Sequence, residues 1–207
     1  MASHLLISSL LILCLAEACY GTVLFSSLKR TLLLQVTPKP GDVLKAGEDK
    51  ITVTWSMNQS FPVGTDEAYK TVKVKLCFAP ISQVDRAWRK TKAELKKDKT
   101  CQFKIFVGSY ELSSKKTQQS FDYSIAKNVP TATFFVRIYA YNAEDHEVAF
   151  GQTTDATKKT NLFTIESITG RHTSIDIAAG CFSAFSIFAL LGFFIAEKRR
   201  GRNSQKN

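Results

Sequence analysis

Residues Thr71–Phe78 read TVKVKLCF, and this stretch carries the clearest structural signal in the chain. Apolar residues fill every second position, and two of the positions between them are lysines. Side chains alternate between the two faces of a strand, so the pattern places the apolar set on one face and Lys73 and Lys75 on the other. A helix would distribute the same residues around its axis. The stretch therefore predicts a half-buried β-strand whose inward side chains are Val72, Val74, Leu76 and Phe78.

Seven further runs alternate in the same way, and no linker, repeat or low-complexity tract separates them. They cover residues 31–36, 51–57, 101–107, 120–125, 131–141, 147–152 and 162–165. Seven or eight short strands in one domain predict two packed sheets. Trp55 and the stretch TFFVRIYA at 133–140 resemble the core tryptophan and the penultimate strand of immunoglobulin and fibronectin-like domains. We predict an all-β fold, an immunoglobulin/fibronectin-like sandwich.

One segment of the body, residues 85–98, breaks the alternating pattern. It reads DRAWRKTKAELKKD and combines helix-forming residues with charges at helical spacing. We therefore expect a short helical insertion in the sandwich, lying between Cys77 and Cys101.

The C-terminal part of the chain predicts one membrane span. Residues 177–196 read IAAGCFSAFSIFALLGFFIA without a charge, and a helix of this length spans about 30 Å, the thickness of the hydrocarbon core. We assign the transmembrane helix to 175–196. The tail at 197–207 is basic, so the positive-inside rule places it in the cytoplasm and the body outside the cell.

The N-terminal residues predict a cleaved signal peptide at 1–21. Residues 5–15 read LLISSLLILCL, and small residues follow at Ala16 and Ala18 in the spacing that signal peptidase accepts. Cys19 to Gly21 provide an equally small second cleavage point, so both positions stay open. The extracellular domain is then expected to cover 22–174.

The cysteines divide by location. Cys14 and Cys19 fall in or beside the signal peptide and Cys181 in the span, which leaves Cys77 and Cys101 in the body. Two cysteines in an oxidising compartment predict one disulfide, and closing this loop stabilises the fold by about 3 to 4 kcal/mol.

An N-glycosylation acceptor triplet begins at Asn58, in the sequence Asn58-Gln59-Ser60. A secreted topology would expose it to the modifying enzyme. We predict Asn58 as the glycosylation site, although such triplets also arise by chance.

Neither catalysis nor nucleic-acid binding is predicted. His146 and His172 lie outside any metal-ligand or nucleophile motif, and the carboxylate pairs at 66–67 and 144–145 fall in predicted turns. The sequence has no glycine-rich phosphate loop. The net charge is +10, but five of the positive charges lie in the tail, so nucleic acid is not needed to explain it. We expect no enzyme, metal or cofactor.

A charged and aromatic segment is the best candidate for partner binding. It contains DRAWRK and, closer to the second cysteine, KKDKTC. Tryptophan and arginine are common hot-spot residues at interfaces, and a disulfide at both ends would lower the entropy cost of ordering the loop. The predicted partner-binding residues are Asp85, Arg86, Trp88, Arg89 and Asp98.

The same residues also have a structural interpretation. Trp88 can pack under its own helix, Arg89 can pair with Asp98, and a basic run is often a solvated face. Spacing alone leaves both interpretations open.

Several longer stretches resemble one known family. They are VTWSMNQS, YKTVKVKLCFAPISQVDRAWRKTKAELKKDKTCQFKI, VPTATFFVRIYAY, EVAFGQT and ITGRHTSIDIAAGCFSAFSIFALLGFF. Together they resemble the plant high-affinity nitrate transporter-activating (accessory) protein family. The resemblance implies a plasma-membrane protein that is not itself a carrier. It implies a partner, a high-affinity nitrate porter of the major facilitator superfamily, bound as a hetero-oligomer. The family's charged segment corresponds here to Arg89 and Asp98; Trp88 is suggested by its chemistry alone.

Two other functions compete with this interpretation. A single-span immunoglobulin-like adhesion or receptor module needs only the sandwich, one glycan and one span. A nitrate-binding protein that presents the anion to a porter would use the basic character that Lys73, Lys75 and Arg137 give the domain.

Overall fold

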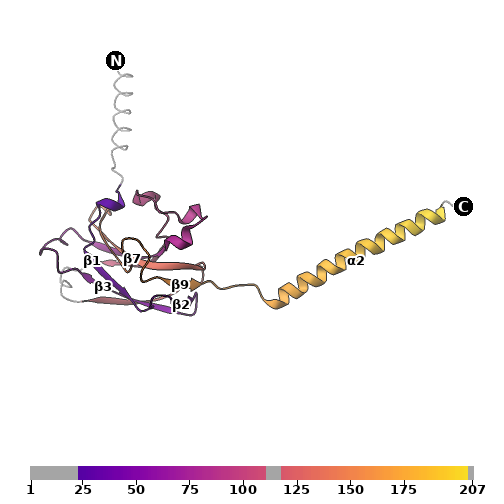
Figure 1. Cartoon of the computed structure of the whole chain (residues 1–207), viewed down its shortest axis with the longest axis horizontal. Coiled ribbons are helices and arrows are strands. Elements are labelled where there is room, and N and C mark those ends of the chain that lie inside the picture. The colour runs from indigo at the N-terminus through magenta and orange to yellow at the C-terminus, as the bar shows by residue number, and fades with distance from the viewer. Residues whose placement is uncertain (1–22, 111–117, 205–207) are drawn as a thin grey trace, which may run out of the picture. The chain divides into compact units, whose positions relative to one another are not determined.

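The computed structural model describes residues 23–110 and 118–204, and the predicted signal peptide at 1–21 lies outside this part of the chain. The chain divides into two compact units, Met1–Ser167 and Ile168–Asn207. The first unit is built of strands and the second of one helix (Figure 1). The strands are β1 (Leu32–Val36), β2 (Val43–Lys45), β3 (Lys50–Met57), β4 (Thr71–Phe78), β5 (Phe103–Ser109), β6 (Gln119–Ser124), β7 (Ala132–Tyr141), β8 (Glu147–Gln152) and β9 (Phe163–Glu166).

The smaller sheet has the order β1-β3-β6 and is antiparallel throughout. Its central strand β3 alternates as the sequence predicts, with Ile51, Val53 and Trp55 buried and the residues between them only partly covered. Trp55 is 3% exposed, which confirms it as a core tryptophan.

The larger sheet is organised around β7, its longest strand. On one side β7 pairs with β4 along the whole of Thr71–Phe78. On the other side it pairs first with β9, through Ala132 to Phe134, and then with β8, through Arg137 to Tyr141. β5 continues the sheet beyond β4, and β2 continues it beyond β9 as a parallel strand.

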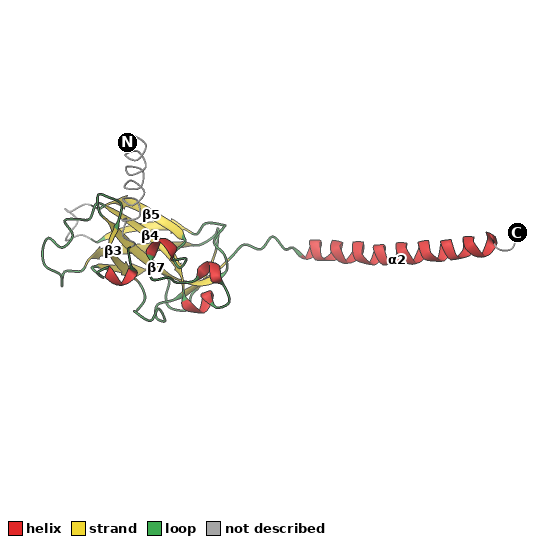
Figure 2. Ribbon diagram, turned by 90° about the horizontal axis from the view of Figure 1, so that it is seen from above, coloured by secondary structure: helices red, strands yellow, loops and turns green. Residues whose placement is uncertain are grey.

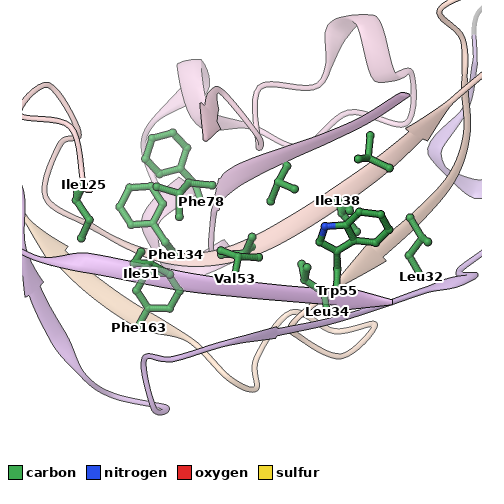
Figure 3. Close-up of a cluster of buried hydrophobic side chains, with 14 of the residues drawn as sticks. Leu32, Leu34, Ile51, Val53, Trp55, Phe78, Ile125, Phe134, Ile138 and Phe163 are labelled. Atoms are coloured by element: carbon green, nitrogen blue, oxygen red, sulfur yellow. The ribbon is translucent and has the colours of Figure 1, made fainter. Parts of the chain in front are cut away.

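The core lies between the two sheets and is aliphatic and aromatic. Figure 3 shows Ile51, Val53 and Trp55 of β3 facing Phe134 and Ile138 of β7. The predicted inward face of β4 is confirmed, since Val72, Val74, Leu76 and Phe78 are each at most 2% exposed. Burial of this apolar set drives the two sheets together.

The sheets approach closely where β8 passes β1. A Cβ atom at Gly151 would collide with the backbone carbonyl oxygen of Leu32. Only glycine permits this approach, so Gly151 fixes how β1 closes against the larger sheet.

The eight predicted strands are all present, with boundaries shifted by at most two residues, and β4 and β8 begin and end as expected. β2 was not predicted, because three residues carry no measurable alternation and its parallel pairing with β9 depends on tertiary contacts.

The segment 85–98, where a helical insertion was expected, contains only two single 3₁₀ turns, η3 (Ala87–Arg89) and η4 (Leu95–Lys97), and a third turn, η2 (Pro80–Gln83), precedes it. Figure 2 draws helical turns in red. Below, the insertion means the whole connection between Cys77 and Cys101. A continuous helix over 85–98 does not form. Asp85 has a φ of 55°, outside the right-handed helical region, and Glu94 is extended because it forms a β-bridge with Leu24.

The second unit is α2 (Thr173–Ser204), a helix of 32 residues. Its Thr173–Arg202 portion is long and apolar enough to cross a membrane. The helix continues through the basic residues after the predicted span, so the boundary at 196–197 is one of composition and not of secondary structure.

Candidate protein-interaction site

A disulfide joins the two ends of the insertion. Cys77 in β4 is bonded to Cys101, two residues before β5, which confirms the predicted pairing. β4 and β5 are antiparallel neighbours, so the insertion is a long connection whose ends are held together by both the sheet and the disulfide.

Side-chain hydrogen bonds hold the first half of the insertion on the sandwich. Gln83 Nε2 donates to the carbonyl of Phe78 at 2.9 Å, and Gln83 Oε1 accepts from the backbone N–H and the hydroxyl of Thr91 at 3.2 and 3.0 Å. Ser82 Oγ accepts from the N–H of Thr133 at 2.8 Å, which ties η2 to β7. These turns therefore form a fixed platform.

Arg89 lies inside this platform. Its side chain is 8% exposed, and the guanidinium carbon lies 4.3 Å from the ring centre of Phe78. Nη1 donates to the carbonyl of Ser82 at 3.3 Å, and Nε has no hydrogen-bond partner within the described residues. Arg89 thus holds the η3 turn against Phe78 of β4, which positions the backbone of η3. Its role in partner binding stays a prediction.

Asp98 organises the second half of the insertion. Its Oδ1 accepts from the N–H of Lys92 at 3.2 Å and from the N–H and hydroxyl of Thr100 at 3.1 and 2.6 Å. The alternative that Arg89 and Asp98 pair with one another is not what the structure shows. The contribution of Asp98 to partner binding also stays a prediction.

The other three predicted residues are on the surface. Asp85, Arg86 and Trp88 are exposed, and Trp88 is 62% exposed, so it does not pack under its own turn. The side-chain amide of Gln102 donates to the carbonyl of Trp88, which holds the backbone of η3 against the start of β5.

Two exposed apolar residues that precede Trp88 in sequence were not predicted as part of the site. Ile81 is 70% exposed and Val84 59% exposed. They belong to η2 and to the residue after it, and η2 contacts η3. The signal available in the sequence was the stretch APISQV, which is apolar yet follows no strand or helix period.

The sequence also gave no indication of an N-terminal strap, residues 23–30. Figure 1 shows the indigo N-terminal turn beside the magenta turns of the insertion. Phe25 N–H donates to the carbonyl of Ala93 at 2.8 Å, and Leu95 N–H donates to the carbonyl of Val23 at 3.0 Å. The strap therefore holds the insertion by backbone hydrogen bonds at Ala93 and Leu95.

The strap covers a buried cation. Arg137 of β7 is 1% exposed, and its guanidinium carbon lies 4.3 Å from the ring centre of Phe25. Its N–H groups donate to Gln152 Oε1 at 3.1 and 2.9 Å and to the hydroxyl of Tyr139 at 3.0 Å. Hydrogen bonds and aromatic rings compensate this charge. In the described part of the chain, no carboxylate lies within salt-bridge distance of Arg137.

The two lysines on the outer face of β4 also contact neighbouring side chains. Lys73 Nζ lies 2.6 Å from Asp145 Oδ1 and 3.8 Å from the ring centre of Tyr141. Lys75 Nζ lies 5.1 Å from the ring centre of Tyr139. Burial lowers the pKa of Lys75 below its usual range, while Glu147 and Asp98 oppose this shift. These contacts give Lys73, Lys75 and Arg137 structural roles; nitrate binding by them stays a prediction.

Asn58 follows β3 in a surface loop. Its Oδ1 accepts from the N–H of Ser60 at 3.0 Å, and the residue is half-buried. Residues of this loop, including Asn58, Phe61 and Val63, line an open pocket of about 540 Å³. Glycosylation at Asn58 stays a prediction.

The described residues contain no group of three or more His, Cys, Asp or Glu side chains that could hold a metal ion. The exposed side chains of the insertion include Trp88 and Arg86, and tryptophan and arginine are enriched at protein interfaces.

A family model and the similar sequences agree on one kind of protein. Residues 25–170 match the family model described as high-affinity nitrate transporter accessory, Ig-like domain. The chain is 47% identical over 209 residues to "High-affinity nitrate transporter 3.1" of Arabidopsis thaliana, covering 97% of each chain. It is 50% identical over 179 residues to "High-affinity nitrate transporter-activating protein 2.1" of Oryza sativa subsp. japonica, covering 86% of this chain and 82% of the relative.

Among solved structures, a Niemann-Pick type C2 protein from Japanese carpenter ant aligns with 71% of this chain and 96% of its own. Its sequence identity is 9% and its TM-score 0.29. This likeness is too low to bear on fold or function.

Proposed function

Because the chain belongs to the high-affinity nitrate transporter accessory family, we propose that it binds a high-affinity nitrate transporter and stabilises the active transporter at the plasma membrane. The resemblance predicted from the sequence is confirmed at the level of the family. The observation that carries the proposal is the 50% identity to a protein named for activating such a transporter.

The partner is a many-spanning nitrate porter of the major facilitator superfamily, and the two chains form a hetero-oligomer. In the described residues one helix is long and apolar enough to cross a membrane. One helix cannot enclose a transport pathway by itself, because each such pathway is lined by several spans. A role in nitrate transport therefore needs a second protein that provides the pathway.

The sandwich lies outside the cell and the basic end of α2 lies in the cytoplasm, as in a single-pass type I protein. The Cys77–Cys101 disulfide supports this orientation, since structural disulfides persist in oxidising compartments. The cluster of Lys198, Arg199, Arg200 and Arg202 supports it as well, because basic residues after a span favour the cytoplasmic side.

Activation requires no catalytic group. A bound protein shifts its partner toward the folded, surface-resident or transport-competent state by the difference in its affinity for those states. A tenfold preference for the competent state corresponds to about 1.4 kcal/mol, which a few interface contacts supply.

The test is nitrate uptake in cells that express this chain alone, a high-affinity nitrate transporter alone, or both, with surface transporter measured in parallel. Uptake and surface transporter should rise in cells that contain both chains, and the two should co-purify. If the pair gives no gain over the transporter alone, the accessory function is wrong, and a single-span adhesion or receptor module becomes the better interpretation.

A further inference from the structure

The insertion carries an exposed apolar surface that the fold does not use. Ile81, Val84 and Trp88 are 70%, 59% and 62% exposed. Ile81 lies on η2, Val84 follows η2 directly and Trp88 lies on η3, and the two turns contact each other. We call these three residues the 81–88 surface. Single exposed apolar residues are ordinary, but three large ones on adjoining turns are typical of an interaction site.

The backbone beneath this surface is held rigidly. Gln83 ties η2 to β4 and to Thr91, Arg89 stacks on Phe78 below η3, and Gln102 holds the carbonyl of Trp88. A surface fixed in this way loses little conformational entropy when a partner binds. The arrangement resembles a preorganised interface more than a mobile loop.

Excess positive charge begins within the 81–88 surface and continues on its C-terminal side in sequence. Seven basic and three acidic residues lie between Asp85 and Lys99. Glu94 is paired with Lys97, and Asp98 already accepts three hydrogen bonds. In the described part of the chain, five exposed cations have no carboxylate within 4.0 Å: Arg86, Lys90, Lys92, Lys96 and Lys99.

We propose that the 81–88 surface docks an acidic segment on the extracellular side of the transporter, one that carries a bulky apolar side chain flanked by carboxylates. The apolar side chain packs on Ile81, Val84 and Trp88, and the carboxylates face the exposed cations of residues 86–99. This inference rests on the proposed function. It goes further in naming the contact residues and the chemistry of the segment that they bind.

The first experiment removes the surface from the full chain. The triple change Ile81→Ser, Val84→Ser and Trp88→Ala should lower the recovery of co-expressed transporter by about tenfold or more, since central aromatic anchors dominate interface energies. Val63→Ser is the matched control, because Val63 is 98% exposed and lies in the β3–β4 connection. Wild-type recovery from the triple variant would overturn the inference.

A second pair of variants tests the charge. Lys90→Glu with Lys92→Glu should weaken the complex several-fold and reverse the effect of added salt, because like charges then face the acidic segment. Lys39→Glu with Lys127→Glu makes the same change in net charge on exposed residues outside the insertion and should leave recovery unchanged. Equal losses from both pairs would contradict the proposed complementarity.

Thiol labelling separates a transporter contact from a membrane contact. Ile81→Cys is labelled on intact cells with a membrane-impermeant maleimide, with the parent chain as background. Labelling should fall when the transporter is co-expressed. Protection in cells that lack the transporter would show that the surface lies on lipid and would overturn the inference. The accessory function itself fails only if the unmodified chain gives no gain in uptake, so the two failures are distinguishable.

Discussion

The guanidinium of Arg89 stacks on the ring of Phe78, with its carbon 4.3 Å from the ring centre, and Trp88 beside it projects into solvent. Arg89 and Trp88, which are adjacent in sequence, thus have different roles. Arg89 anchors the η3 turn to β4, and Trp88 presents an apolar side chain on the outer side of the same turn.

Replacing Arg89 should therefore lower the stability of the fold. Arg89→Ala removes the stacking and the bond to the Ser82 carbonyl and should destabilise the fold by about 1 to 3 kcal/mol. Thermal unfolding of the full chain in detergent measures this loss. Arg86→Ala, at an exposed position in the same segment, should change stability by less than about 0.5 kcal/mol. Equal effects of the two substitutions would contradict an internal role for Arg89.

Substitutions of Asp98 should separate its hydrogen bonds from its charge. Asp98→Asn keeps a carbonyl oxygen for the donors on Lys92 and Thr100, whereas Asp98→Ala leaves all three donors without it. The alanine variant should lose about 1 to 2 kcal/mol and show faster hydrogen exchange over residues 90–100, and the asparagine variant should lose less. Equal losses from the two variants would show that the carboxylate charge matters more than its hydrogen bonds, because both substitutions remove the charge and only asparagine keeps an acceptor.

Breaking the disulfide should loosen the insertion and the whole sandwich. Cys77→Ser with Cys101→Ser opens a loop with a sequence separation of 24 residues. Loop-closure entropy predicts a loss of about 3 to 4 kcal/mol. Denaturant unfolding with and without reductant measures it: the reductant should lower the midpoint of the wild-type chain and leave the double variant unchanged.

The N-terminal strap should protect the insertion from hydrogen exchange. Phe25→Ala uncovers the Arg137 guanidinium and removes packing against Phe150, whose ring centre lies 4.7 Å from that of Phe25. Exchange of the Leu95 amide should rise, because its acceptor is the carbonyl of Val23. Leu33→Ala, at an exposed position of β1, is the control. Unchanged exchange at Leu95 would mean that the strap does not hold the insertion.

Acid should weaken the loop after β8. Hydrogen bonds from the Thr157 hydroxyl and the Lys159 N–H lower the pKa of Asp155 to about 2 from 3.8. A carboxyl group with a lowered pKa stabilises the folded state above pH 3.8, and this contribution disappears as the pH falls toward 2. Asp155→Asn should therefore be less stable than wild type at pH 7, and the difference should shrink between pH 4 and pH 2. A difference that is independent of pH would exclude the ionised carboxylate as its cause.

Sequence reasoning succeeded where local pattern decides structure. The alternation in Thr71–Phe78 predicted β4 and its buried face, and Trp55 was correctly placed in the core. It failed where contacts between residues distant in sequence decide the structure. The sequence suggests that Arg89 is a surface charge, but in the structure it stacks on Phe78, eleven residues earlier. Glu94 has helical neighbours in sequence, but a bridge to Leu24 holds it extended.

The strap also determines when folding can finish. Phe25 is among the first residues of the sandwich to be synthesised, yet its binding surface includes Arg137 and Phe150. About 110 residues separate Phe25 from Arg137, and at about 5 to 20 residues per second the ribosome needs roughly 5 to 20 seconds to make them. Contacts of such long range form late in folding. The first segment of the sandwich to be synthesised is therefore among the last to dock, and a chaperone that shields exposed aromatic side chains has this interval in which to act.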